Sequence, residues 1–255
     1  MAESGRQWLR TMGEQVTRLF GSSPRSCTST DEQGWLGLSG EPLADLNMAC
    51  VFSGPTSIRR LNEYVEAANR AEVPIIVMLE ESSDEVVSAA TTLGATHVGN
   101  IPIMVWRDSV IPERTKDGQT RIAMDETERT LAVEVMAEAF SLDLAICKIV
   151  LLPILQSHNV TCWIRERNQQ VIGAAIGIRS DDIVGVYSMA TQNQFQRNGI
   201  GKSILSSMMS NYLDEGVTSF YLGATPAGLH LYEQLGYETI ANPAALVVGS
   251  STQFH

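Results

Sequence analysis

The chain has 255 residues, of which 44% are hydrophobic and 18% charged, a composition typical of a globular protein with a sizeable core. Its formal net charge of −11 argues against binding to nucleic acid or to an anionic membrane surface, because both select for basic proteins. The four cysteines form no C-x-x-C pair, and no histidine lies at zinc-ligand spacing from them, so no metal site is expected.

The N-terminal segment does not resemble a signal peptide, because residues 1–20 are amphipathic and charged throughout. No apolar run reaches the ~18 residues that would span a bilayer. We therefore expect a cytoplasmic protein with reduced thiols that is not bound to a membrane.

The first half of the chain alternates helices and strands. Residues 5–20 predict a helix with one apolar face, formed by Trp8, Met12, Val16 and Leu19. Residues 21–33, rich in Ser, Thr and Pro, predict a loop, so residues 1–33 form an N-terminal helix and loop. The elements expected within residues 34–107 are a strand at 44–52, a helix at 56–71, a strand at 74–80, a helix at 82–94 and a strand at 101–107.

Residues 108–119 are polar and contain a proline and a glycine, which predicts a linker to a second domain at 120–255. The strands expected in that domain lie at 120–125, 160–166, 170–179, 182–191, 218–224, 237–240 and 244–249. The helices lie at 126–140, 142–155, 199–214 and 227–236, the first with Leu131, Val135 and Ala139 in one row. Short polar turns join the three strands of 160–191, so these form an antiparallel meander.

The two halves contain a repeat. Residues 91–106 and 233–248 are similar when Leu93 is aligned with Leu235, an offset of 142 residues (235 minus 93). At this offset, the strand at 74–80 falls near the one at 218–224, and the helix at 56–71 near the one at 199–214. The pattern predicts that residues 44–106 duplicate the second half of the C-terminal domain.

The segment QFQRNGIGKSIL (194–205) is compatible with three phosphate-binding patterns. A nucleoside-triphosphate loop needs a glycine where Gln196 stands, and no strand supplies an acid for magnesium. A dinucleotide loop needs a third glycine at Ile204. The third pattern, Q-x-x-G-x-G, fits, because Gln196, Gly199 and Gly201 follow a strand and open a helix.

The start of that helix has the chemistry of an anion site. Successive backbone N–H groups and the helix dipole attract a pyrophosphate, and Arg197 and Lys202 add positive charge beside it. Glycines at 199 and 201 allow the phosphates to approach the backbone closely.

A second motif, LYEQLGY (231–237), follows one strand and most of a helix further on. Together, Q-x-x-G-x-G and L-Y-E-x-L-G-Y in this order resemble the GCN5-related N-acetyltransferase (GNAT) superfamily, over residues 120–249. The resemblance implies an α/β fold with a mixed sheet, the acyl-CoA N-acyltransferase fold. It also implies acetyl-CoA as cosubstrate, no metal, an active C-terminal domain and a partial, degenerate GNAT-like repeat at 34–107.

The resemblance also assigns roles to residues. Pantetheine would bind the strand backbone at Met189, Ala190 and Thr191, and the pyrophosphate would bind the loop formed by Gln196, Arg197, Asn198, Gly199, Ile200, Gly201 and Lys202. Thr225 stands where many members carry an asparagine that contacts the cofactor. Tyr232 matches the family tyrosine near the thioester sulfur.

The expected chemistry is direct transfer. A neutral primary amine attacks the thioester carbonyl, and a backbone N–H within residues 189–191 stabilises the oxyanion. The phenol of Tyr232, with a reference pKa of about 10, then protonates the departing thiolate. Asp181, Asp182, Glu166, His230 or a water chain could serve as general base.

The N-terminal copy lacks this chemistry, because its loop reads SGPTS and Ala90 stands at the position of Tyr232. The expected acceptor is a small-molecule amine, and the acidic balance of the chain favours a cationic one. A protein N-terminus or lysine is the second choice, and a homodimer is left open. The alternative from another class is a non-catalytic sensor or scaffold that binds CoA or acyl-CoA.

Overall fold

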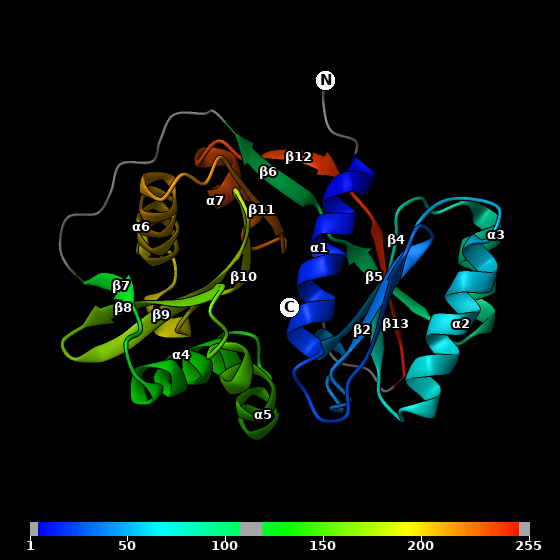
Figure 1. Ribbon diagram of the computed structural model, residues 1–255, viewed down its shortest axis with the longest axis horizontal. Coiled ribbons are helices and arrows are strands. Elements are labelled where there is room, and N and C mark those ends of the chain that lie inside the picture. The colour runs from blue at the N-terminus through cyan, green and yellow to red at the C-terminus, as the bar shows by residue number, and fades with distance from the viewer. Residues whose placement is uncertain (1–4, 108–118, 250–255) are drawn as a thin grey trace. The chain divides into compact units, whose positions relative to one another are not determined.

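The computed structural model describes residues 5–107 and 119–249 (Figure 1), which form two compact units. The first unit comprises residues up to 103 together with residues from 239 onward, and the second comprises residues 104–238. The continuous domains predicted from the sequence, 34–107 and 120–255, do not account for this interleaving. The predicted linker lies outside the described residues, apart from Gln119.

The first sheet has six strands in the order β1-β2-β3-β4-β13-β5. Strands β3 and β4 are parallel, and the other neighbours pair antiparallel. The strands of this sheet are β1 (Cys27–Asp31), β2 (Gly34–Leu38), β3 (Asn47–Val51), β4 (Ile75–Leu79), β5 (Thr96–Asn100) and β13 (Ala244–Val248). The helices of this part of the chain are α1 (Gly5–Phe20), the short 3-10 helix η1 (Ala44–Leu46), α2 (Ser57–Arg70) and α3 (Asp84–Thr92).

The apolar face predicted for α1 is buried, and the indole N–H of Trp35 donates to the carbonyl oxygen of Leu9 on this helix. Three strands were not predicted. Strand β2 (GWLGL) is buried throughout but lies outside every expected element. Strand β1 falls within the expected loop 21–33, and its side chains are all exposed and mostly polar, so it carries no hydrophobic alternation. Strand β5 reads THVGN and has the same lack of signal. The strand expected at 44–52 divides into η1 and β3.

The second sheet has seven strands in the order β12-β6-β11-β10-β9-β8-β7. Strands β8, β9 and β10 form the antiparallel meander expected from the sequence, and β10 is parallel to β11. The strands are β6 (Ile103–Arg107), β7 (Thr120–Ile122), β8 (Val160–Arg167), β9 (Gln170–Ser180), β10 (Ile183–Thr191), β11 (Ser219–Gly223) and β12 (Glu238–Ala241). The helices are α4 (Glu126–Ala139), α5 (Leu144–Ile154), η2 (Asn193–Phe195), α6 (Ile200–Asp214) and α7 (Leu229–Gln234).

Helices α4 and α6 cover opposite faces of the second sheet (Figure 1). The core on the α6 side contains Ile204 and Met208 of α6 together with Val184 and Val186 of β10. Helix α4 begins at an Asp125 cap, whose carboxylate accepts from the backbone N–H of Glu128. The predicted row is buried only in part: Val135 is buried, whereas Leu131 is 38% exposed. The residues that α4 buries are Ala132, Val133, Val135, Met136 and Ala137.

The predicted repeat is confirmed in the order of elements. The series β3-α2-β4-α3-β5-β6 corresponds to β10-α6-β11-α7-β12-β13. The order of strands within the sheets also corresponds: β2-β3-β4-β13-β5 in the first sheet matches β9-β10-β11-β6-β12 in the second. One pair of strands is exchanged, because the fourth place in each of these orders is taken by the last strand of the other half.

The chain crosses between the sheets at two equivalent segments. The side-chain amide of Asn100 donates to the carbonyl oxygen of Asn242 at 2.9 Å, and these residues are separated by the offset of the repeat, 142 positions. The N–H of Ile101 donates to the carbonyl oxygen of Pro243 at 3.0 Å. Within 5–107 and 119–249, no helix is long and apolar enough to cross a membrane.

Candidate active site

Strands β10 and β11 form a fork. Their parallel pairing runs from Ile183 opposite Ser219 to Val186 opposite Leu222, whereas β10 continues to Thr191. A β-bulge lies just past the last paired residue, where the register of β10 against β9 shifts and Ser188 has a φ of 47°. Because a bulge bends and twists its strand, β10 diverges from β11 here.

The backbone segment expected to bind pantetheine lies on the free arm of this fork. Ala190 is buried, whereas Met189 and Thr191 are half-buried. Ala190 and Thr191 pair with β9 on one side, and no β11 residue pairs with them in the parallel register. An extended ligand could therefore lie along this side of β10 in the manner of an added strand.

The loop after β10 turns the chain into α6. Arg197 has a φ of 59° and Gly199 a φ of 76°, both in the left-handed region. Gly199 is the N-cap and offers no side chain to cap the helix. The first helical bond runs from the N–H of Ser203 to the carbonyl oxygen of Gly199. The amides of Ile200, Gly201 and Lys202 therefore precede the hydrogen-bonded part of the helix, and with the helix dipole they favour an anion.

The two glycines of the motif serve different purposes. A Cβ on Gly199 would meet no atom within 4 Å, so it is the positive φ that favours glycine there. A Cβ on Gly201 would lie 3.1 Å from Cδ2 of Leu231. Gly201 thus allows α6 to pack closely against α7, a role that the sequence analysis did not assign to it.

Gln196 and Asn198 brace the loop from within. The amide of Gln196 donates to Oδ1 of Asn193 at 3.0 Å, and the amide of Asn198 donates to the carbonyl oxygen of Gln196 at 3.2 Å. These side chains hold the backbone of the loop in shape. Arg197 and Lys202 are exposed beside it.

Two further cations near this loop were missed from the sequence. Nη1 of Arg165 donates to Oγ of Ser203 in the first turn of α6 at 3.0 Å, and the guanidinium of Arg167 lies 6.0 Å from the ring centre of Phe195. Both arginines are on β8. The signal for them in the sequence is the alternation in CWIRER, within a strand of the predicted meander. In that meander, β8 and β10 flank the same strand, β9, so side chains of β8 can lie near the loop that follows β10.

Tyr232 lies on α7, and only 7% of the residue is exposed. Its ring centre is 6.0 Å from that of Tyr237, and a Cβ on Gly228 would lie 2.7 Å from its ring. Burial raises the pKa of Tyr232 to about 12, so the hydroxyl is protonated at neutral pH. Thr225 is half-buried before α7, and its carbonyl oxygen accepts from the N–H groups of Gly228 and Leu229.

The structure brings the predicted groups together. Tyr232 of α7, Ile200 of α6 and Leu222 of β11 belong to one buried cluster, and Met189 of β10 packs against it. The fork, the start of α6 and Tyr232 therefore border one core, and a Cβ on Gly201 would lie 3.1 Å from Leu231 and 3.8 Å from Cε of Met189.

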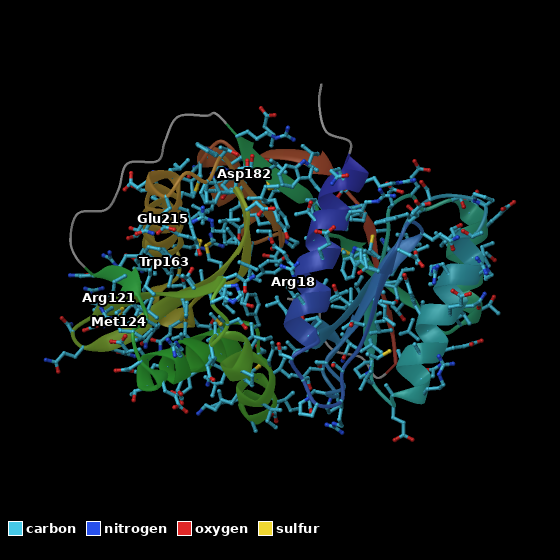
Figure 2. All side chains as sticks on the ribbon, in the orientation of Figure 1. Arg18, Arg121, Met124, Trp163, Asp182 and Glu215 are labelled. Atoms are coloured by element: carbon cyan, nitrogen blue, oxygen red, sulfur yellow. The ribbon has the colours of Figure 1, made fainter. Side chains whose placement is uncertain are left out.

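The candidate general bases lie in three separate places. Glu166 forms an ion pair with Arg121 at 3.0 Å, and the exposed His230 contacts the side-chain amide of Gln234. Asp182 accepts from the hydroxyl of Thr218 at 2.9 Å, and its neighbour Asp181 occupies the same exposed turn. Arg121 and Asp182 lie well apart in Figure 2. Within the described ranges, no three His, Cys, Asp or Glu side chains are grouped to hold a metal ion.

Comparison with known proteins finds a family match at this site. Residues 158–239, which contain the fork, the loop and Tyr232, match the acetyltransferase (GNAT) domain family. The match supports the enzyme class that the two motifs predicted, an acetyl-CoA-dependent N-acetyltransferase. A comparison with curated proteins finds no match.

Solved structures support the GNAT fold over nearly the whole chain. A GCN5-related N-acetyltransferase from Kribbella flavida is similar with a TM-score of 0.69 at 17% identity, over 98% of each chain. One from Sphaerobacter thermophilus has a TM-score of 0.62 at 14% identity, over 88% of this chain and 80% of that one. A tandem GNAT protein from the clavulanic acid biosynthesis pathway has a TM-score of 0.53 at 10% identity, over 98% of each chain. The predicted fold, with a GNAT-like repeat in the first half, is confirmed.

Proposed function

We propose that this GNAT domain transfers the acetyl group of acetyl-CoA to the primary amine of a small molecule, with Tyr232 as general acid. The observation that carries the proposal is the convergence of the β10–β11 fork, the open start of α6 and the buried phenol of Tyr232 around one core. Each of these three features supplies one requirement of acyl transfer from a coenzyme thioester.

The cosubstrate would be held mainly by backbone groups. Pantetheine would pair with Met189, Ala190 and Thr191 on the free side of β10, as an added strand does. The pyrophosphate would accept from the amides of residues 197–202, where the helix dipole and the exposed Arg197 and Lys202 favour negative charge. Arg165 and Arg167 of β8 add positive charge on the same side of the loop, and Thr225 would contact the pantetheine near α7.

The reaction needs one bond formed and one broken. The nitrogen of the neutral amine attacks the thioester carbon, and a backbone N–H near the bulge stabilises the oxyanion. The C–S bond then breaks, and the hydroxyl of Tyr232 gives its proton to the departing sulfur. The proton lost by the amine passes to water, and solvent reprotonates the phenolate. A phenol with a pKa of about 12 retains its proton until the thiolate forms.

The acceptor proposed is a cationic small molecule. The net charge of −11 attracts cations to the protein over several ångströms and repels anions. We also propose that the first half of the chain is non-catalytic, because Ala90 stands at the position of Tyr232 and is itself buried.

Thiol release with acetyl-CoA, measured across a panel of primary amines, tests the proposal. At least one small cationic amine should accelerate release, and mass spectrometry should find the amine heavier by one acetyl group. If no amine accelerates release while CoA still raises the melting temperature, the protein is a CoA-binding sensor or scaffold instead. A protein acceptor is tested in the same assay with peptides bearing a free N-terminus or lysine.

A further inference from the structure

Gly173 of β9 lies where the two parts of the cosubstrate site meet the sheet. It pairs with Thr191, on the free arm of β10, on one side and with Arg165 of β8 on the other. A Cβ at this position would lie 2.7 Å from Cγ2 of Ile200 and 3.3 Å from the carbonyl oxygen of Ala190. The first turn of α6 and the free arm of β10 therefore both approach the backbone of one residue that has no side chain.

The start of α6 could not lie so close to a larger residue. Ile200 cannot turn its Cγ2 away freely, because a β-branched residue has one strongly preferred rotamer in a helix. Cδ1 of Ile204, one turn further along α6, would lie 2.8 Å from the same Cβ. An alanine at 173 would therefore push the first turn of α6 away from β9, together with the amides of Ile200, Gly201 and Lys202.

A polar contact fixes the same turn from the other strands. Oγ of Ser203 is buried, accepts from Nη1 of Arg165 at 3.0 Å and shares a hydrogen bond with Oγ1 of Thr120 at 2.9 Å. Nη1 of Arg165 also donates to Oγ1 of Thr120 at 3.0 Å. Because this triangle joins α6 to both β7 and β8, it restrains rotation of the first turn about the helix axis.

We propose that Gly173 and Ser203 are positioning residues for acetyl-CoA, which set the distance and orientation of the first turn of α6 relative to the free arm of β10. This inference rests on the proposed function, in which pantetheine lies along that arm and the pyrophosphate lies at the start of α6. One cosubstrate then bridges both elements. A shift of the helix against the strand misplaces one group of the cosubstrate when the other is bound.

The far end of α6 distinguishes this role from packing alone. Gly177 lies four residues along β9 on the same face, and a Cβ there would lie 2.9 Å from Oη and 3.0 Å from Cε2 of Tyr212. Gly177 pairs with Val186, which is still paired with Leu222 of β11. Two glycines thus allow the two ends of one helix to approach one strand, but only Gly173 lies beside the open arm of the fork.

Isothermal titration calorimetry with acetyl-CoA on the full chain tests this role. In Gly173→Ala the dissociation constant should rise at least about tenfold. The matched control is Gly177→Ala, which overpacks the same strand against the same helix. The control should keep the dissociation constant within about twofold of wild type, although both variants should lower the melting temperature. A purely structural role would not separate affinity from stability in this way.

A second pair of variants tests the polar contact. Ser203→Ala removes the triangle and should raise the dissociation constant for acetyl-CoA at least about threefold. The control is Ser207→Ala, one turn further along α6. Oγ of Ser207 is also buried, and it has no hydrogen-bond partner in the part of the chain that the structure describes. The control should leave the affinity unchanged.

Two results would overturn the inference: wild-type affinity in Gly173→Ala, or an equal loss of affinity in Gly177→Ala. If Gly173→Ala does not fold, Ser203→Ala decides, and wild-type affinity in that variant, or the same loss in Ser207→Ala, overturns the inference. If the wild-type protein does not bind acetyl-CoA at all, it is the proposed function that fails. That outcome differs from tight binding by wild type and variant alike.

Discussion

The two halves of the molecule contain the same strand-helix-strand crossover, β3-α2-β4 in the first and β10-α6-β11 in the second. The two crossovers differ in where the pairing of their parallel strands stops. In the first, parallel pairing continues to Val51 opposite Leu79, the last residues of both strands. In the second it stops at Val186 opposite Leu222, while β10 continues past a bulge. The register of β3 against β2 is regular. The bulge is therefore what converts a closed pair of strands into a fork that a cosubstrate can enter.

The first half, in which the two parallel strands stay paired to their ends (the closed half), also contains a bound carboxylate, that of Glu80. The N–H of Glu80 donates to the carbonyl oxygen of Val51, which extends the ladder beyond β4. The carboxylate of Glu80 accepts from the N–H and hydroxyl of Ser53, at 2.8 and 2.9 Å, and from Nε of Arg6 at 2.8 Å. Ser53 lies in the loop before α2, the counterpart of the loop before α6. A protein carboxylate thus lies beside the loop that corresponds to the proposed phosphate-binding loop.

Helix caps do not distinguish the halves. Both α2, after Thr56, and α6, after Gly199, begin without a side-chain cap. A helix start without a side-chain cap is therefore not what sets the two halves apart: the second half differs by its open strand and by the glycine at the start of α6.

The largest expected effect comes from placing a carboxylate at the start of α6. Gly199→Asp places a negative group and a left-handed non-glycine residue at the start of α6, and should weaken acetyl-CoA binding at least about 1000-fold, or about 4 kcal/mol. Isothermal titration calorimetry measures this loss. The matched control is Gly94→Asp, because Gly94 has a φ of 78° and equally open surroundings. It should cost about 1–2 kcal/mol of stability but leave binding intact. Retained affinity in Gly199→Asp would refute the phosphate site.

The second effect is on catalysis. Tyr232→Phe removes the acid that the first half lacks, and should lower kcat about 100-fold while the affinity for acetyl-CoA is nearly unchanged. The control is Tyr237→Phe, which removes a buried hydroxyl from the neighbouring ring, bonded to Sδ of Met209. An undiminished kcat in Tyr232→Phe would remove the general-acid role.

The third effect concerns the closed half. Glu80→Gln weakens charge-assisted bonds to Arg6 and Ser53, and should lower the free energy of unfolding by about 2 kcal/mol, measured by urea denaturation. The control is Glu66→Gln on α2, whose exposed pairing with Arg70 at 3.7 Å contributes at most about 0.5 kcal/mol.

Wild type and variant should both bind one acetyl-CoA per chain. A second bound molecule in wild type would contradict the non-catalytic assignment of this half.

The smallest effect is the pH dependence of the same contact. Burial opposes ionisation of Glu80, but the bonds from Arg6 and Ser53 outweigh it and lower its pKa below 4.5. The stabilisation is therefore present above pH 4.5 and is lost as the pH falls through the folded-state pKa. The difference in unfolding free energy between wild type and Glu80→Gln should shrink as the pH falls below 4.5 through the folded-state pKa of Glu80. A constant difference would show that the charge is not what stabilises the contact.

Local motifs predicted the second half well, because its loop and α7 carry glycines and a tyrosine at fixed spacing. Contacts between distant residues were not predictable in this way. Glu80 and Arg6 are 74 residues apart, and neither belongs to a motif. Strand β1 has only exposed side chains, so its pairing with β2 leaves no hydrophobic pattern. The bulge at Ser188 was also invisible, since nothing in VYSMAT distinguishes it from a regular strand.

The exchanged strands were predicted as strands, but their exchange between the two sheets was not predicted. IMVWR of β6 and AALVV of β13 are both apolar and almost entirely buried. Such segments suit the interior of either sheet. The choice depends on the whole arrangement of the two halves, which short-range patterns do not specify.

The exchange has a consequence for dissecting the gene. A cut between residues 107 and 119 would separate each sheet from an interior strand, leaving β4 and β5 without β13, and β11 and β12 without β6. Each fragment would expose unpaired strand edges, a known cause of aggregation. We therefore expect the halves to be insoluble when expressed singly and to recover acetyl-CoA binding when co-expressed. Because each half completes the sheet of the other, neither half can be removed or replaced alone without opening both sheets.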